Sequence, residues 1–180
     1  MQSTFFFLIV ALAVTAIGAF YDLRSWRIPN WLSFGALAFG PVAHFALDTW
    51  TQGLQAGFMA AGGSILGGVL CGFVPWLGWR FGAFGGGDVK LLAAVGALCL
   101  PKLGVTIEFD AIIVGLVFAG ARLAYEGRLF RTFGRSLLLV VNPLLPRARR
   151  IAIPEAVMTP MPFGPAIAGG VVVCALFQAA

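Results

Sequence analysis

Long apolar runs with almost no charge dominate the sequence and limit what the chain can fold into. The first run, Ser3–Tyr21, contains no Asp, Glu, Lys or Arg. Over the whole chain, 60% of the residues are hydrophobic and 11% are charged. A soluble domain has about 45–50% apolar and about 25% charged residues, so this composition excludes an ordinary soluble fold. The sequence therefore predicts an all-α, polytopic membrane protein.

Several segments are apolar enough to be candidate membrane spans. A helix needs about 20 mostly apolar residues to cross a bilayer. The fourth and sixth candidates are short, and the fifth is the weakest because Glu108 and Asp110 lie near one end and Arg122 near the other. We expect one membrane domain over residues 1–180 with about six transmembrane helices. The candidates are Ser3–Tyr21, Trp31–Leu47, Ala56–Gly78, Val89–Leu100, Val105–Tyr125 and Ala166–Ala180.

The basic residues are distributed unevenly between the loops that join these candidates. Nearly all of the Lys and Arg residues fall in or beside the first, third and fifth loops. The positive-inside rule places these loops in the cytoplasm, and six spans then put both termini outside. We interpret the cluster Arg147–Arg150 as a contact with anionic lipid rather than with nucleic acid. The apolar segment Ser136–Leu145 is too short to span and is expected at the interface.

The cysteines and the histidine do not indicate a metal site or a cofactor. Cys71, Cys99 and Cys174 are dispersed, and no CxxC pair is present in the sequence. They are therefore expected to be buried free thiols rather than zinc ligands or disulfides. His44 is the only histidine and lies near the outer end of the second candidate span. We expect no metal and no cofactor.

Two aspartates interrupt the apolar pattern at the same predicted edge of the membrane. Asp22 ends the first candidate span, and Pro29 disfavours helix at the residue before it, so the first helix should stop at or before Arg27. Asp88 precedes the fourth candidate span. Because two spans separate the acids, both return to the cytoplasmic edge. This is the minimum geometry for a carboxylate pair in which one acid activates water and the other protonates the departing amine.

The glycine run Gly85–Gly87 precedes Asp88 where the fourth candidate is short for a bilayer. Val89–Leu100 would extend about 18 Å as a helix, against a hydrocarbon core of about 30 Å. Either the bilayer thins, or the glycines enter the membrane as non-helical chain beside a cavity. Glycines also permit positive φ and close backbone approach, which would let an extended substrate strand lie near Asp88. The helix dipole is expected to disfavour a carboxylate at Asp22 and to favour one at Asp88.

Other interpretations of the two acids stay open at this point. Alone, Asp22 would pair with Arg24 or Arg27, and Asp88 would cap the N-terminus of the fourth helix. Together they also suit a small proton-coupled transporter with Asp22 and Asp88 as relay carboxylates, although no convincing internal repeat is visible. An enzymatically silent membrane scaffold is a third possibility. Lys90 either assists a carboxylate or the substrate, or extends to the membrane surface.

Other residues are best explained by packing or by the membrane interface. Trp26 and Trp31 are placed as interface anchors. The segment Pro162–Pro165 is compatible with the first turn of the last helix. Overlapping small-xxx-small spacings predict close packing of the third helix; the residues are Gly62, Gly63, Gly67, Gly68 and Gly72.

Three motifs, in order along the chain, resemble those of the bacterial type IV prepilin peptidases, a family of GxGD aspartic membrane proteases. DLRSWRIPN at Asp22–Asn30 resembles the first aspartate region of the family. GGGD at Gly85–Asp88 matches the GxGD element, and the run to Ala97 is similar to the family's continuation. MPFGPAIAGG at Met161–Gly170 resembles the C-terminal PFGP element. The resemblance implies that Asp22 and Asp88 are the catalytic pair. It also implies supporting roles at the active site for Gly85, Gly86, Gly87, Lys90, Pro29, Asn30, Pro162, Phe163 and Gly164.

The resemblance implies an aspartic endopeptidase that removes the short basic leader of prepilins or pseudopilins. The site would face the cytoplasm from the bacterial inner membrane, with prepilins and the lipid bilayer as partners and no nucleic acid; a homo-oligomer is compatible with the sequence. Long family members carry a cytoplasmic domain with paired CxxC motifs, associated with N-methylation. No such motif precedes the first span here. The resemblance thus points to the short form, like the peptidases of tight-adherence (Flp) pilus systems, without expected methylation.

Overall fold

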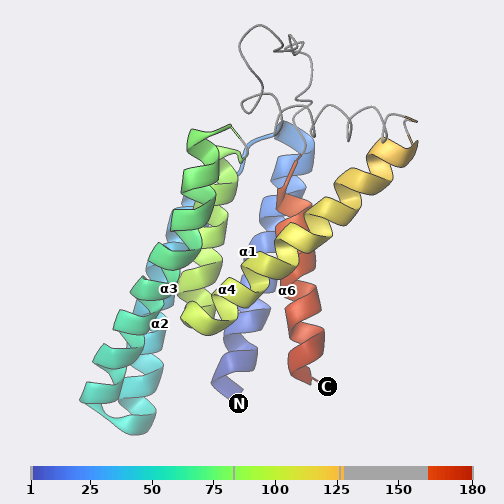
Figure 1. Ribbon diagram of the computed structural model, residues 1–180. Coiled ribbons are helices and arrows are strands. Elements are labelled where there is room, and N and C mark those ends of the chain that lie inside the picture. Colours follow the sequence, from blue (N-terminus) through green and yellow to red (C-terminus); the bar gives the residue numbers. More distant parts are fainter. Residues whose placement is uncertain (1, 83, 126, 128–161, 180) are drawn as a thin grey trace, which may run out of the picture. The chain divides into compact units, whose positions relative to one another are not determined.

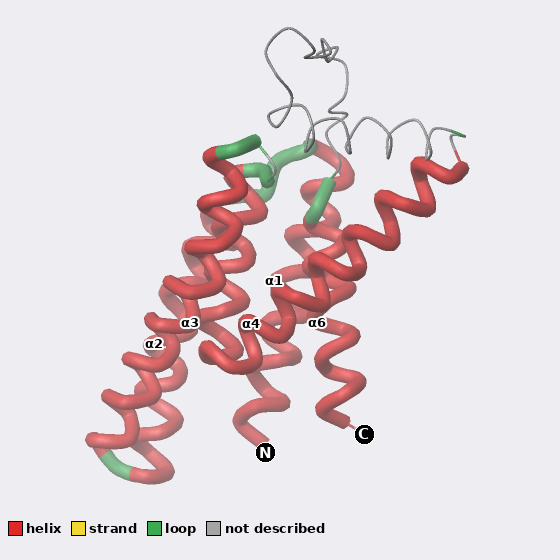
Figure 2. Tube along the Cα trace, viewed as in Figure 1, coloured by secondary structure: helices red, strands yellow, loops and turns green. Residues whose placement is uncertain are grey.

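The fold is given by a computed structural model that describes residues 2–82, 84–125, 127 and 162–179. Within these residues all regular structure is helical, which confirms the predicted all-α class (Figures 1 and 2). The predicted interfacial segment Ser136–Leu145 and the cluster Arg147–Arg150 lie outside the described residues. The helices are α1 (Gln2–Ser25), α2 (Asn30–Gln52), α3 (Leu54–Arg80), α4 (Gly86–Tyr125) and α6 (Gly164–Ala179).

Three helical segments of the described chain are long and apolar enough to cross a membrane by length and composition. These are Thr4–Ser25, Leu54–Arg80 and Gly86–Tyr125, and Gly164–Gln178 is a shorter apolar helix. Large apolar side chains such as Leu116 lie exposed on their outer faces, as expected of surfaces in contact with lipid. The expected total of about six spans and the outside location of the N-terminus stay predictions.

The turn between α1 and α2 forms where the sequence predicted the first helix to stop. α1 ends at Ser25, and Trp26 adopts a left-handed conformation with φ 55°. The Trp26 N–H donates to the Asp22 carbonyl over 2.9 Å. Pro29 is extended, with φ −62° and ψ 135°, and its carbonyl accepts the first free N–H groups of α2 from Leu32 and Ser33. The turn therefore holds the last part of α1 close to the start of α2.

The chain divides into two units, and the site described below lies entirely in the first. This unit contains Met1–Gly115 and Pro162–Ala180, and the second contains Leu116–Met161. In the first unit α2 packs along α3 and α1 packs along α6 (Figure 1). The first half of α4 supplies its centre, because Leu91, Leu92 and Leu98 are at most 1% exposed. Asp88 thus lies at the start of this buried half of α4.

The fourth and fifth candidate spans form two helices that the label α4 joins across a sharp kink, and the chain turns back there so that Gly104 lies against Gly96. α4 breaks at Leu100, with φ 64° and ψ 166°, just before Pro101. Proline has no N–H, so the carbonyl of Ala97, four residues earlier, loses its helical donor. Ser64 Oγ from α3 donates to this carbonyl over 2.5 Å, and His44 Nε2 from α2 bonds to the Leu98 carbonyl over 2.9 Å. Side chains of neighbouring helices therefore satisfy the backbone groups that the kink releases, as broken helices in membranes require.

The contribution of the Ser64 hydrogen bond to the stability of the kink can be tested by mutation. Ser64→Ala leaves the buried Ala97 carbonyl without a donor, which is expected to lower the free energy of unfolding by about 1–3 kcal/mol. Ser33→Ala is the matched control, because the Ser33 hydroxyl is equally buried but has no partner among the described residues. Unfolding of the purified protein in mixed micelles measures both variants. Equal stability of the two would contradict this role for Ser64.

Candidate active site

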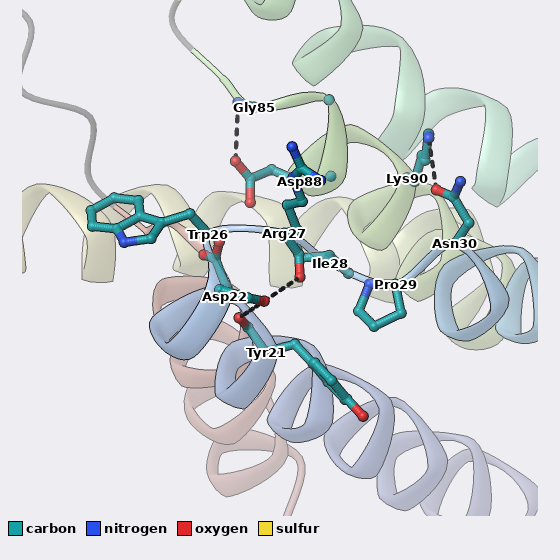
Figure 3. A pocket seen from close by; sticks show the side chains of 13 residues that line it. Tyr21, Asp22, Trp26, Arg27, Ile28, Pro29, Asn30, Gly85, Asp88 and Lys90 are labelled. Carbon is teal, nitrogen blue, oxygen red and sulfur yellow. Dashed lines mark hydrogen bonds between the residues drawn. The ribbon is translucent and has the colours of Figure 1, made fainter.

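Both aspartates line a single pocket of about 520 Å³ in the first unit (Figure 3). Asp22 comes from the end of α1 and Asp88 from the first turn of α4, and each is only 7% exposed. Figure 3 shows the two side chains directed toward the same space from their separate helices. The structure thus brings together the two acids that the sequence placed at one edge. The pocket is lined by Tyr21, Asp22, Ser25, Trp26, Arg27, Ile28, Pro29, Asn30, Gly85, Gly86, Gly87, Asp88 and Lys90.

The carboxylate of Asp88 is held by the backbone at the start of its own helix. Its Oδ2 accepts a hydrogen bond from the Gly85 N–H over 3.0 Å. In return the Asp88 N–H donates to the Gly85 carbonyl over 3.1 Å. The first bond is one half of a capping box, in which an acid in the first turn satisfies the N–H of the capping residue; because Gly85 has no side chain, its carbonyl accepts the second bond. Asp88 therefore caps the helix from its third residue and not as the N-cap residue that the sequence suggested, and this bond holds the carboxylate at the pocket wall.

The carboxylate of Asp22 is held by a helix that begins far along the chain. Its Oδ2 accepts a hydrogen bond from the N–H of Gly164, the first residue of α6, over 2.8 Å. The PFGP element therefore contacts the first aspartate directly. The expected contrast in helix dipoles needs correction, because Asp22 lies near the C-terminal end of α1 but its carboxylate meets the N-terminal end of α6. The positive end of a helix therefore favours a carboxylate at both sites.

The glycines before Asp88 serve close packing rather than an unusual backbone conformation. Gly86 and Gly87 already belong to α4, so the expectation of non-helical chain at this point was wrong for them. None of Gly85–Gly87 has a positive φ. A Cβ at Gly87 would lie 3.2 Å from Ile28 Cβ, and one at Gly85 would lie 2.9 Å from Asp88 Oδ2. The glycines therefore let the start of α4 pack tightly against the first aspartate's turn and leave room for the carboxylate.

The basic residues near the pocket do not neutralise the two acids. Among the described residues neither aspartate forms an ion pair, so the interpretation of Asp22 as a partner of Arg24 or Arg27 is not supported. Lys90 Nζ donates instead to Asn30 Oδ1 over 3.0 Å and lies 5.2 Å from the centre of the Phe34 ring. This contact joins the start of α2 to α4 at the pocket rim. It leaves both carboxylates to hydrogen bonds from the backbone.

The pocket also includes residues that the sequence did not single out. Tyr21, Ser25 and Ile28 line it, and so does Trp26, which the sequence placed only as an interface anchor. Ser25 Oγ donates to the Tyr21 carbonyl over 2.8 Å and stabilises the turn. The signal for Ser25, Trp26 and Ile28 was their place between Asp22 and Pro29, since a turn that returns the chain to the same edge must surround the acid, and Tyr21 directly precedes Asp22. Pro162 and Phe163 do not line the pocket but precede the contact made by Gly164.

Comparison with known proteins identifies the family of this chain. The sequence matches the type IV leader peptidase family over residues 6–120. The chain belongs to the type IV leader peptidase family. The matched region includes both aspartates and the whole pocket lining, so membership of this family rests on the part of the chain that builds the site. The family resemblance inferred from the motifs is confirmed.

The similarity of this leader peptidase family member to a known protein extends beyond residues 6–120. The chain is 28% identical over 171 residues to the prepilin leader peptidase/N-methyltransferase of Bacillus subtilis (strain 168). The alignment covers 94% of this chain and 54% of the relative, so the chain spans about half the length of that protein. No solved structure matches the chain.

Proposed function

We propose that the protein is an integral-membrane aspartic endopeptidase, with Asp22 and Asp88 as its catalytic pair. It removes the basic leader from type IV prepilins or pseudopilins at the cytoplasmic face of the bacterial inner membrane. The observation that carries the proposal is the convergence of the two buried aspartates, from α1 and α4, on one pocket. Family membership supports the reaction class, and the name of the Bacillus relative supports prepilins as the substrates.

The pocket supplies the two proton transfers that amide hydrolysis needs. One carboxylate, ionised, takes a proton from water as the water oxygen bonds to the scissile carbonyl carbon. The other, protonated, gives its proton to the leaving nitrogen as the carbon–nitrogen bond breaks, and the products are an acid and an amine. Each aspartate uses Oδ2 to accept a glycine N–H, which leaves its second oxygen for water or substrate. Protonation of that second oxygen preserves both glycine hydrogen bonds.

The wall beside Asp88 is suited to an extended peptide. Gly85 and Gly86 are exposed and line the pocket, and they present no side chain to a neighbouring strand. A substrate backbone can therefore lie against this wall within reach of the acid. Lys90 and Asn30 form the adjacent rim, where we place further contacts with the leader or with the start of the mature pilin.

We propose the number of spans and the orientation in the membrane from the hydropathy and charge patterns, and the substrate class from the motifs. We place about six spans in one membrane domain, with both termini outside and the aspartate edge in the cytoplasm. Arg24, Arg27, Arg80 and Lys90 all flank that edge, as the positive-inside rule requires of cytoplasmic loops. We propose Flp-type prepilins as the substrates, because the sequence has the family's three motifs without a CxxC pair, as the short-form peptidases do.

Co-expression with an Flp-type prepilin tests the proposed function. The wild-type chain is expected to shorten the prepilin by the mass of its leader, measured on the intact pilin. A prepilin with a substituted cleavage-site residue is the control and should keep its leader. Full retention of the leader on prepilins of several classes, with the peptidase present in the membrane fraction, would overturn the proposal.

The contact between Gly164 and Asp22 predicts a sensitive position outside the GxGD element. A Cβ at Gly164 would lie 3.0 Å from Asp22 Oδ2 and 3.1 Å from Ala19 Cα, so a side-chain rotation cannot relieve both contacts. Gly164→Ala is therefore expected to displace the carboxylate and to lower kcat by about 10- to 100-fold. Gly35→Ala, where a Cβ meets nothing within 4 Å, is the matched control. Steady-state cleavage rates that are the same for both variants would contradict the contact.

A further inference from the structure

Two phenylalanines directly precede the two glycines that hold the aspartates. Phe84 comes before Gly85, whose N–H bonds to Asp88, and Phe163 comes before Gly164, whose N–H bonds to Asp22. The two rings contact each other edge to face, with their centres 5.1 Å apart and their planes at 82°. One aromatic contact therefore connects the segments that hold the two acids, although these segments are remote in sequence.

Each ring also packs closely against the backbone of a helix at a glycine. A Cβ added at Gly78 in α3 would lie 2.5 Å from Phe84 Cδ2. A Cβ added at Gly115 in α4 would lie 2.5 Å from Phe163 Cε2. Because no side chain fits between either ring and the helix backbone at that glycine, each ring has a defined position against its helix. The Phe163 carbonyl in addition accepts the N–H groups of Ala166 and Ile167, which fixes this residue at the start of α6.

We propose that Phe84 and Phe163 are positioning residues that set the separation of the two catalytic carboxylates. The proposal rests on the proposed peptidase function. Neither ring lines the pocket, so neither is placed to touch substrate, and the pair acts through the glycine N–H groups one residue further along. We call these two residues the phenylalanine clasp.

The clasp constrains the separation of the two acids from the side of the segments that donate hydrogen bonds to them. Asp22 and Asp88 are carried by different helices, and aspartic hydrolysis depends on both acids reaching one substrate carbonyl. A misplacement of about 1 Å can reduce a rate by about 100-fold. The structure has no bond between the two carboxylates among its described hydrogen bonds, so their separation depends on the segments that hold them. The phenylalanine clasp joins the two segments that end in Gly85 and Gly164.

Kinetics of the purified full chain test the clasp against an ordinary packing role. Phe84→Leu and Phe163→Leu are each expected to lower kcat for prepilin cleavage by about 10- to 100-fold, with KM changed by less than about twofold. The double variant should be no slower than the slower single variant, because either change releases the same contact. Phe84→Tyr and Phe163→Tyr keep an aromatic ring and should retain most of the activity. Phe73→Leu, in an exposed aromatic pair on α3, is the control.

A second variant keeps the test valid if removal of a ring prevents folding. Gly78→Ala retains Phe84 but displaces its ring from the α3 backbone. It should therefore lower kcat, as the Phe84→Leu variant does. Gly62→Ala on the same helix meets nothing within 4 Å and should leave kcat unchanged. Wild-type kcat in Phe84→Leu, or multiplicative losses in the double variant, would overturn the clasp.

Glycine amide NMR signals separate failure of the clasp from failure of the proposed function. In protein labelled with ¹⁵N-glycine, Phe84→Leu should move the Gly164 signal and Phe163→Leu should move the Gly85 signal, while Phe73→Leu moves neither. If the wild-type chain cleaves no prepilin, the peptidase proposal fails, and unmoved signals overturn the clasp as well. If the wild type cleaves and the Leu variants match it in rate and in signals, the clasp alone is wrong.

Discussion

Asp22→Asn and Asp88→Asn are each expected to reduce prepilin cleavage by about 1,000-fold or more. Asparagine keeps the shape of the side chain and can accept the glycine N–H at its amide oxygen, so the packing around each residue is preserved. It cannot, however, take a proton from water or give one to the leaving nitrogen, and each such transfer contributes about 10²- to 10⁴-fold. The proposed two-proton mechanism uses both buried acids, so loss of either one is expected to stop the reaction.

Single-turnover cleavage by purified variants in detergent micelles measures these losses. The double Asn variant should be about as slow as either single variant, because groups that act as a unit give non-additive effects. Asp48→Asn is a matched control, since Asp48 lies near the end of α2, outside the pocket, where it accepts a hydrogen bond from Gln52. Substantial cleavage by either active-site variant would exclude the two-acid mechanism.

The same variants address the transporter alternative. Relay carboxylates would carry protons without any prepilin, so wild-type protein in vesicles would dissipate a pH gradient and the Asn variants would not. We expect no such difference between wild type and the Asn variants. Substrate-independent proton flux that depends on Asp22 and Asp88 would favour the relay over the peptidase.

The acid pair could be found from the sequence because its signals are local. Pro29 ends the first helix in a predictable way, and the spacing of apolar runs returns Asp88 to the level of Asp22. The contact between Asp22 and Gly164 could not be found in this way, because it joins residues 142 positions apart. The dipole argument used only the helix that carries each acid. The effect of α6 on Asp22 depends on a packing arrangement that no local pattern encodes.

The kink in α4 shows a second limit of local reasoning. Hydropathy and length divided this helix into two spans near Leu100, since Pro101 and Lys102 interrupt the apolar run. The structure breaks α4 at Leu100 as this division predicted, but the partners of the carbonyls that the break frees could not be predicted. Those partners, Ser64 and His44, lie on other helices. The sequence contained them, but nothing in their surroundings indicated which backbone groups they would meet.

Gly67→Ala is expected to be the most destabilising single-methyl change in the scaffold. A Cβ at Gly67 in α3 would overlap the Gly96 carbonyl of α4, and a Cβ at Gly96 would overlap the Gly67 carbonyl in return. Because both obstacles are backbone atoms, the helices must separate rather than a side chain rotate. Overpacking of this kind costs about 1–3 kcal/mol, and we expect the upper end of that range. Gly96→Ala should behave in the same way.

Gly62→Ala provides the comparison that isolates the helix contact. Gly62 lies on the same helix, but an added Cβ meets nothing within 4 Å, so alanine there should be neutral or stabilise α3 by up to about 1 kcal/mol. Unfolding in mixed micelles measures the difference, and similar stabilities for Gly62→Ala and Gly67→Ala would contradict the close approach. The comparison also bears on the site, because the part of α4 that Gly67 contacts lies about two turns beyond Asp88. Separation of the helices there should lower cleavage even under conditions in which the protein remains folded.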